Sequence, residues 1–365
     1  MADGGGAPDP AAPGGAAEPP ALERVLRFDD RPLVPGAATW PVDVPPFEEG
    51  RFHSPKHRVL QLLMRAAQEG AIRLPAPLRR GVVGALARTG RAADRRHTRA
   101  AEEYIRAALP LATDPEVDAL VAAGWRHLLR VALAALGVGR SVVGRRFGDH
   151  YELSACAEAM EVLERPEGAI ILTAHAGFWE ASCPALVAMG WTPIYGVGKA
   201  PRNDFVARDL QRMREQQGMR VIPRRGAMAA VPAAVRAGAT VGMLLDHRPR
   251  RKPVWAPFFG RLAACDRSAG VLLRRVRAPL VFYGCYSVPG TDALDDWRFQ
   301  LRFPRVLHPE ELAGLDPEAV AARVNAELER IILHRPDEVF WLHDRFKGAP
   351  APSGGGSGGE SSPGR

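Results

Sequence analysis

The sequence predicts an α/β fold in which a central mixed sheet is flanked by helices, with a helical part on its N-terminal side. From residue 151 onward, short apolar runs that are typical of buried strands alternate with segments of helical periodicity. Residues 51–140 instead repeat apolar side chains at spacings of three and four, which indicates helices. The chain has 365 residues, 46% of them hydrophobic, so it is long enough to bury a self-supporting core.

Composition divides the chain into four parts. Residues 1–20 and 349–365 consist mainly of Gly, Ala, Pro and Ser. We expect both to be disordered tails, because they hold too little apolar surface to offset the entropy lost on ordering. Residues 21–150 comprise an N-terminal segment and a basic helical region, and residues 151–348 form the α/β domain.

The charge is concentrated in the helical region. Residues 1–50 carry a net charge of −6, whereas residues 51–100 hold twelve Lys or Arg and two acids, a net charge of +10. Such a segment indicates an anionic partner: nucleic acid, an acidic protein or an anionic membrane surface. No zinc-finger or RNA-binding signature is present. The alternative is a solvated helical face in an Arg-rich chain, since only four of the 49 basic residues are Lys.

The order of elements after residue 151 follows from the periodicity. Ala169–Ala174 is continuously apolar, as expected of a strand that is buried on both faces. Further strands are expected at 193–198, 219–222, 240–245, 280–286 and 297–303. Helices are expected between and after them, at 178–189, 205–217, 228–237, 266–276 and 317–334.

The sequence shows no targeting or membrane-spanning segment. The first 20 residues lack a basic and an apolar stretch of the kind found in signal peptides. The apolar run Ala119–Gly139 carries Arg126, His127 and Arg130, so we do not expect it to cross a bilayer. The four cysteines are far apart in the chain, which favours a reducing compartment. These observations predict a soluble or peripheral protein.

The residues that carry chemistry follow the first long apolar strand. The segment from His175 to Glu180 places a histidine at the end of the strand, Gly177 at the turn and an acid in the first helical turn. In this geometry the Glu180 carboxylate can hold one imidazole nitrogen and leave the other free as a base. The alternative interpretation is a buried histidine that is satisfied by a neighbouring acid.

The context of this motif resembles the bacterial lipid A late acyltransferases, which belong to the lysophospholipid acyltransferase superfamily. Five blocks occur in the order typical of that family. They are Ile171 to Glu180, Pro201-Arg202-Asn203, Gly242 to His247, Pro257-Phe258-Phe259-Gly260 and Arg335 to Lys347.

The resemblance implies a glycerolipid acyltransferase-like sandwich for the α/β domain. It also implies transfer of a fatty acyl group from an acyl thioester to a hydroxyl of a glycolipid or lipid A precursor. The donor would be an acyl carrier protein thioester or acyl-CoA, acting as co-substrate, with no bound cofactor or metal. We therefore expect a peripheral enzyme at the cytoplasmic face of the bacterial inner membrane, held there by the basic segment and by apolar contacts from Val82, Val83, Leu86 and Trp125.

The same resemblance assigns roles to individual residues. His175 would be the general base, with Glu180 orienting it and stabilising its charge. The oxyanion would be bound by backbone N–H groups near Gly177 or by a nearby cation. Lys199 would meet a phosphate or the oxyanion, and Asp246 would fix a cation or an acceptor hydroxyl.

Two further substrate-binding residues are expected. Asn203 lies in the block that matches the family's basic-Pro-Asn segment. Arg248 begins a basic cluster after Asp246 that either holds an acceptor phosphate or forms a solvated loop.

Three residues depart from the family pattern. Lys199 stands where Arg is usual and so lacks the bidentate fork of a guanidinium, Cys265 replaces Thr, and His247 replaces Gln. The usual N-terminal membrane anchor is also missing from the pattern.

Three other functions remain open from the sequence. A phospholipid acyltransferase of the lysophosphatidate type usually has an Asp after the His and a Phe-Pro-Glu-Gly-Thr block, and neither is present. A non-catalytic basic membrane-binding protein would leave the His-Glu motif unexplained. A metallohydrolase would need more ligands, for which His247 and His343 are candidates.

Overall fold

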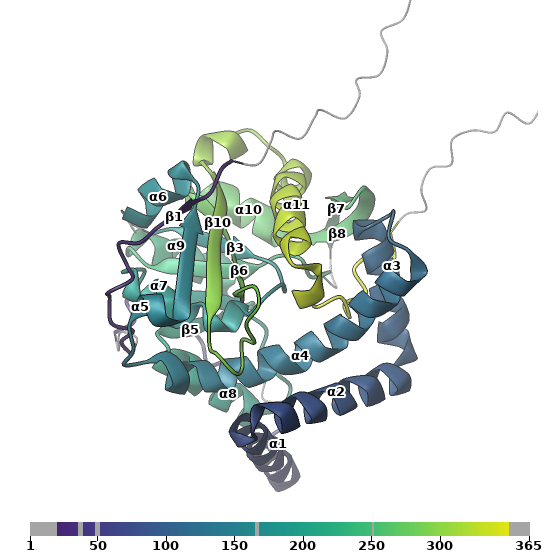
Figure 1. The fold of residues 1–365 in the computed structure, drawn as a ribbon. Helices are drawn as coiled ribbons and strands as arrows, with labels where there is room; N and C mark the ends of the chain where they lie inside the picture. The colour runs from purple at the N-terminus through teal and green to yellow at the C-terminus, as the bar shows by residue number, and fades with distance from the viewer. Residues whose placement is uncertain (1–19, 36–38, 48–51, 165–167, 250–251, 350–365) are drawn as a thin grey trace, which may run out of the picture.

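The computed structural model describes residues 20–35, 39–47, 52–164, 168–249 and 252–349 (Figure 1). Apart from Pro20 and Ala349, the predicted tails lie outside these residues. The fold class is the predicted one, with a central mixed sheet, flanking helices and a helical N-terminal part.

Among the described residues, four helices form the N-terminal part, and each begins at a recognisable start signal. They are α1 (Pro55–Arg73), α2 (Ala76–Ala93), α3 (Arg95–Ala108) and α4 (Asp114–Val142). Proline stands in the first turn of α1, α2 and α4, where its missing N–H leaves no helical hydrogen bond unmade. The Asp94 side chain accepts the backbone N–H of His97 at the start of α3, and Thr113 and Glu116 form a capping box at α4.

In the part of the chain that the structure describes, eight strands form the central sheet. Their bounds are β1 (Glu23–Arg24), β2 (Tyr151–Ala155), β3 (Ile170–Thr173), β4 (Ile194–Gly198), β5 (Met219–Pro223), β6 (Thr240–Leu244), β9 (Leu280–Ser287) and β10 (Phe299–Leu307). Their order is β1-β2-β10-β9-β3-β6-β4-β5. The run from β9 to β5 is parallel, whereas β10 is antiparallel to β9 and β1 to β2. All six predicted strands are confirmed; β1 and β2 were not expected.

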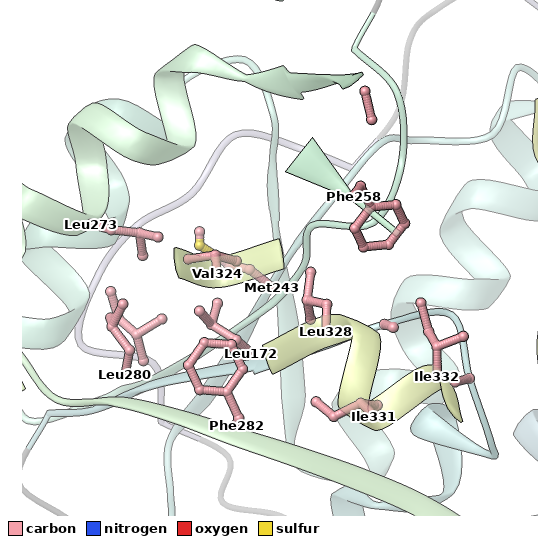
Figure 2. Packing of buried hydrophobic residues seen from close by; sticks show 14 of the residues in the cluster. Leu172, Met243, Phe258, Leu273, Leu280, Phe282, Val324, Leu328, Ile331 and Ile332 are labelled. Carbon is pink, nitrogen blue, oxygen red and sulfur yellow. The ribbon is translucent and has the colours of Figure 1, made fainter. Parts of the chain in front are cut away.

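Helices cover both faces of the sheet. They are α5 (Phe147–His150), α6 (Ala157–Glu164), α7 (Cys183–Ala188), α8 (Asp204–Gln216), α9 (Ala227–Arg236), α10 (Arg267–Val276) and α11 (Pro317–His334). Figure 2 shows Leu172 and Met243 of the sheet packed against Leu328 of α11, in a cluster that also includes α9 and α10. On the other face, Ile171 and Val281 pack with α4, α6 and α7. Because strand side chains alternate between faces, a continuous apolar run is what this double burial requires.

A two-stranded hairpin, which the sequence did not predict, lies outside the central sheet. It pairs β7 (Pro253–Phe258) with β8 (Arg261–Asp266). Phe259 and Gly260 connect the strands, and both have positive φ, 49° and 67°, as a two-residue type I′ turn requires. The Pro-Phe-Phe-Gly block is therefore a hairpin turn. Buried Phe258 anchors it beneath the Arg345 guanidinium, which lies 4.7 Å from the ring centre.

The N-terminal helices differ in how they treat their apolar side chains. In α4 many of these side chains are buried, among them Val121 and Val138. Helices α1 and α2 expose a set of large ones: Val59, Leu60, Leu62, Leu63, Met64, Leu78, Val82 and Leu86. Of the described helices, α4 is the one with the length and apolar composition to cross a membrane, and 39% of its most apolar stretch is buried within the protein.

Two of the four apolar side chains that we expected at a membrane are not positioned for it. Val82 and Leu86 are exposed, but Val83 is buried. Trp125 packs against the core, and its indole N–H donates to Oγ1 of Thr98. The difference arises because Val83 and Trp125 face neighbouring helices, whereas α1, which we had not singled out, exposes more apolar surface than α2.

Candidate active site

His175 and Asp246 lie beyond the carboxyl ends of two neighbouring parallel strands. Strands β3 and β6 pair with Thr173 opposite Leu244. His175 and Asp246 each stand two residues past that pair, so the strand register brings them to the same level. In α/β folds the crevice outside the carboxyl ends of parallel strands is the usual place for a ligand site.

Asp246 holds His175 through two hydrogen bonds. The His175 backbone N–H donates to Oδ2 of Asp246 at 2.9 Å, and the imidazole Nδ1 lies 2.7 Å from Oδ1. Burial by itself would raise the pKa of Asp246, but attraction to His175 and these hydrogen bonds outweigh it and hold the pKa well below its usual range. Because an ionised carboxylate only accepts hydrogen bonds, Nδ1 carries the proton of this contact, and in the neutral imidazole Nε2 is therefore the nitrogen with the lone pair.

Gly177 shapes the loop after the histidine. Its φ is +62°, and a Cβ at this position would overlap the carbonyl oxygen of Cys285, so only glycine fits. The predicted turn at Gly177 is therefore confirmed. The Gly177 N–H donates to the carbonyl of Glu338 at 2.6 Å, and the Phe178 N–H donates to that of Cys285. These two N–H groups are not available to an oxyanion, contrary to our expectation.

The same loop is closed by the C-terminal block. Ala176 forms an antiparallel β-bridge with Val339, and the Phe340 N–H donates to the carbonyl of His175 at 2.8 Å. From α4, Nε2 of His127 donates to the Gly177 carbonyl at 3.0 Å. Burial lowers the pKa of His127 to about 3, so this histidine is neutral at pH 7.

Glu180 forms a hydrogen-bonded ion pair with Arg214, and its expected contact with His175 is not formed. It lies in the 3₁₀ turn Trp179–Ala181, and its carboxylate pairs with the guanidinium through Nε–Oε2 at 3.1 Å and through a second bond from Nη2 to Oε1. Both side chains are largely buried. The predicted contact between His175 and Glu180 is therefore wrong. The 3₁₀ turn directs Glu180 toward α8, while the strand register places Asp246 at Nδ1.

Three histidine rings stack at the site. The ring of His247 lies parallel to that of His175, with 3.7 Å between centroids and 8° between planes. His343 stacks on the other side of His247 at 4.2 Å. Burial lowers the pKa of His247 to about 3 and that of His343 to about 4, so both are neutral at pH 7. In the described part of the chain, no three His, Cys, Asp or Glu side chains are arranged to hold a metal ion.

His175 opens into a cavity of about 570 Å³, which we call the catalytic cavity. Exposed polar residues line its entrance: Lys199, Arg224 and Ser268. Buried apolar residues line its interior: Leu186, Ile194 and Tyr283. Gly196 and Gly242, which are cross-strand partners in β4 and β6, form part of its floor, where the missing side chains leave room for a ligand. The cavity thus combines a polar entrance with an apolar interior.

The predicted substrate-binding residues lie in different places. Lys199 follows β4 and lines the catalytic cavity, whereas Asp246 is committed to His175. Asn203 caps α8: its Oδ1 accepts the Phe205 N–H at 3.0 Å, and its Nδ2 donates to the His57 carbonyl at 2.9 Å. The amide is thus occupied by the backbone, which corrects its predicted substrate contact.

The basic cluster after Asp246 is only partly placed. The backbone N–H of Arg248 donates to Nε2 of His343 at 2.8 Å, and Arg248 is not among the described residues that line the catalytic cavity. Arg250 and Arg251 lie outside the described residues.

Sequence reasoning missed two features of this site. The pairing of His175 with Asp246 had a usable signal, since both follow predicted buried strands at the same distance. Arg214 had none, because its contact with Glu180 depends on the angle at which α8 crosses the loop.

The family profile agrees with this geometry. The bacterial lipid A biosynthesis acyltransferase family matches residues 54–348, from the start of α1 to the end of the closing block. No curated protein matches the chain. Proteins of this family are membrane-associated. Because the match covers most of the chain and includes His175, Asp246 and the catalytic cavity, the chain belongs to the bacterial lipid A biosynthesis acyltransferase family and is an acyltransferase with lipid A-like substrates.

Proposed function

We propose that this enzyme transfers a fatty acyl group from an acyl thioester to a hydroxyl of a glycolipid or lipid A precursor, with His175 as the general base. The observation that carries the proposal is the hydrogen bond between Nδ1 of His175 and Asp246. It directs the other nitrogen, Nε2, to act as the base in the neutral imidazole, beside a cavity that combines polar and apolar walls.

The mechanism follows from which group takes up the proton of the attacking hydroxyl and which group receives it. A lipid hydroxyl has too high a pKa to attack a thioester unaided, so Nε2 of His175 takes its proton as the hydroxyl oxygen bonds to the carbonyl carbon. The C–S bond then breaks, and the imidazolium returns the proton to the departing thiolate. Asp246 stays ionised throughout and stabilises the imidazolium between the two steps.

Lys199 and Glu180 take supporting roles in this proposal. Lys199 at the cavity entrance supplies positive charge for the oxyanion or for a phosphate of a substrate. Glu180 acts through Arg214: the buried ion pair fixes the turn that carries Trp179, whose ring lies 5.1 Å from that of His175. Glu180 is then a positioning residue and not the direct partner of the base.

The catalytic cavity suits the donor. An acyl chain would lie over the floor formed by Gly196 and Gly242, and the phosphopantetheine end would reach the cations Lys199 and Arg224 at the entrance. Acyl carrier protein and coenzyme A share this phosphopantetheine group, so either thioester fits the proposal.

We also propose that the enzyme is held peripherally at the cytoplasmic face of the bacterial inner membrane. Helices α1 and α2 present Leu63, Leu78 and other apolar side chains next to exposed cations such as Lys56 and Arg88. Each cation near an anionic leaflet contributes about 1 kcal/mol before screening by salt. Binding to liposomes should therefore require anionic lipid and weaken steeply with salt. Salt-insensitive binding to neutral liposomes would contradict an electrostatic attachment.

The function is tested by lipid mass spectrometry of a bacterial strain that lacks the gene. We expect one lipid A or glycolipid species to lose a single acyl chain, the wild-type gene to restore it and His175→Ala to fail at equal protein level. His97→Ala, which alters an exposed histidine of α3, should restore it like the wild type. Full restoration by His175→Ala would overturn the role of the base, and loss of a chain from phosphatidic acid-derived lipids alone would overturn the acceptor class.

A further inference from the structure

A second cavity lies on the other side of the catalytic loop. It has a volume of about 850 Å³ and is enclosed by α1, α4 and α8, so we call it the α4–α8 cavity. Its interior is apolar, formed by Val131, Ala132, Leu136, Leu210 and Met213, with exposed Leu128 at its edge.

The two cavities meet at the 3₁₀ turn. Trp179, Glu180, Leu210 and Arg214 line both of them. The Trp179 ring contacts the His175 ring edge-on, so one layer of side chains separates the α4–α8 cavity from the base. A ligand in this cavity would therefore end one layer of side chains away from the His175 ring.

The outer wall of the α4–α8 cavity is formed by α1, which exposes more large apolar side chains than the other described N-terminal helices. Met64 lines the cavity and is 45% exposed, and its neighbours Leu60 and Leu63 are 51% and 63% exposed. Each charged residue at the rim has an ion-pair partner: Arg140 binds Glu69 at 2.8 Å, and Asp209 lies 2.7 Å from Arg212 and 3.8 Å from Arg65. An apolar interior behind a rim of ion-paired residues fits an uncharged hydrocarbon better than a phosphate group.

We propose that the α4–α8 cavity receives a hydrocarbon chain of the acceptor lipid, drawn from the bilayer beneath α1. This inference rests on the proposed function, in which the acceptor is a lipid. The donor chain already has a compartment over Gly196 and Gly242, whereas the acceptor must leave the membrane at the helix that exposes apolar side chains. With its chain in the cavity, the acceptor reaches His175 past Trp179, from the side opposite to the thioester.

Photocrosslinking in vesicles tests the occupant directly. The vesicles contain phosphatidylcholine, phosphatidylglycerol and a trace of phosphatidylglycerol with a diazirine at the end of one acyl chain. In the wild type we expect adducts on α1 and also on the cavity-lining parts of α4 and α8, residues 128–143 and 206–217. Ala132→Phe places a ring in the cavity; displacing two or three methylenes from an apolar site should lower the α4 and α8 adducts about tenfold or more.

Two controls separate chain binding from folding and from docking. Ala122→Phe makes the same change at another half-buried position of α4 that lines neither cavity, and it should keep the wild-type adducts. Adducts on α1 should remain in both variants, because docking at the membrane surface does not need the cavity.

The outcomes also distinguish this inference from the proposed function. Adducts on α4 and α8 that persist in Ala132→Phe, or adducts on α1 alone, would overturn the inference whatever the turnover. If Ala132→Phe instead weakens binding of palmitoyl-CoA, the cavity belongs to the donor and the inference is wrong. If the wild-type protein shows no acyl transfer but its α4 and α8 adducts are lost in Ala132→Phe, the inferred lipid site is supported and the proposed reaction is wrong.

Discussion

The two carboxylates beside the catalytic loop have partners of different chemistry. Asp246 contacts an imidazole that gains and loses a proton in the proposed reaction, whereas Glu180 contacts a guanidinium that is always charged. Glu180 is five residues from His175 in the chain, whereas Asp246 follows another strand, β6. The comparison teaches that strand register, and not distance along the chain, decides which acid controls the base. Asp246 should therefore affect the chemistry, and Glu180 the position of the loop.

The largest expected effect comes from removing the charge of Asp246. Asp246→Asn keeps the shape of the side chain but no longer stabilises the imidazolium, so we expect kcat to fall roughly 10²–10⁴-fold. The measurement is turnover of palmitoyl-CoA with a lipid acceptor, with thermal unfolding as the check on folding. A kcat close to that of the wild type would show that Asp246 is not the orienting group.

The effect of Glu180 should appear first in stability. Removing one partner of a buried ion pair leaves an uncompensated charge, so Glu180→Gln and Arg214→Gln should each lower the free energy of unfolding by about 3–5 kcal/mol. The double variant should recover part of this loss. Urea unfolding measures it, and kcat of Glu180→Gln should exceed that of Asp246→Asn. The reverse order of the two kcat values would make Glu180 the partner of the base.

A smaller effect is expected at the floor of the catalytic cavity, where a substitution should impair use of the donor and so distinguish this cavity from the α4–α8 cavity. A Cβ on Gly242 would have its nearest neighbour, Cγ1 of Ile171, at 3.5 Å, so Gly242→Val should fold. Its side chain would shorten the space for the donor, and excluding two or so methylenes should lower kcat/KM for palmitoyl-CoA about tenfold while sparing octanoyl-CoA. Equal losses with both donors would argue against an acyl chain on this floor.

The smallest expected effect is a change in the pH dependence of stability. In the unfolded chain His127 has its ordinary pKa of 6.5 and takes up a proton below that pH. In the folded protein burial lowers its pKa to about 3. The free energy of unfolding should thus fall as pH drops from 6.5 toward 3, by about 1.4 kcal/mol per pH unit for this group. His247 and His343 act in the same direction.

His127→Gln can keep the hydrogen bond to the Gly177 carbonyl but cannot be protonated. Its stability should decline less steeply than that of the wild type between pH 6.5 and pH 5, as measured by urea unfolding. Identical slopes for the two proteins would mean that His127 is not held neutral behind the loop.

The sequence predicted the fold better than it predicted the site. Elements with strong periodicity or continuous apolar runs, such as β3 and α11, lie where they were expected. The hairpin β7–β8 was missed because Arg261, Pro257 and several alanines give it no alternation. In the site, the turn at Gly177 was predictable from local chemistry. The pairing of His175 with Asp246 left a signal in the equal spacing after two predicted strands, which was not recognised, whereas the partner of Glu180 left none, since it depends on the crossing of α8.

The β-bridge between Ala176 and Val339 has a consequence for the synthesis of the enzyme on the ribosome. A ribosome releases the chain from its N-terminus, so α1 and α2 emerge long before Val339, Phe340 and His343. Until those residues arrive, the carbonyl of His175 and the N–H of Gly177 lack the backbone partners that close the catalytic loop. We expect a nascent chain to be able to contact the bilayer before it can catalyse acyl transfer. Translation would then deliver the protein to its substrate before activity begins.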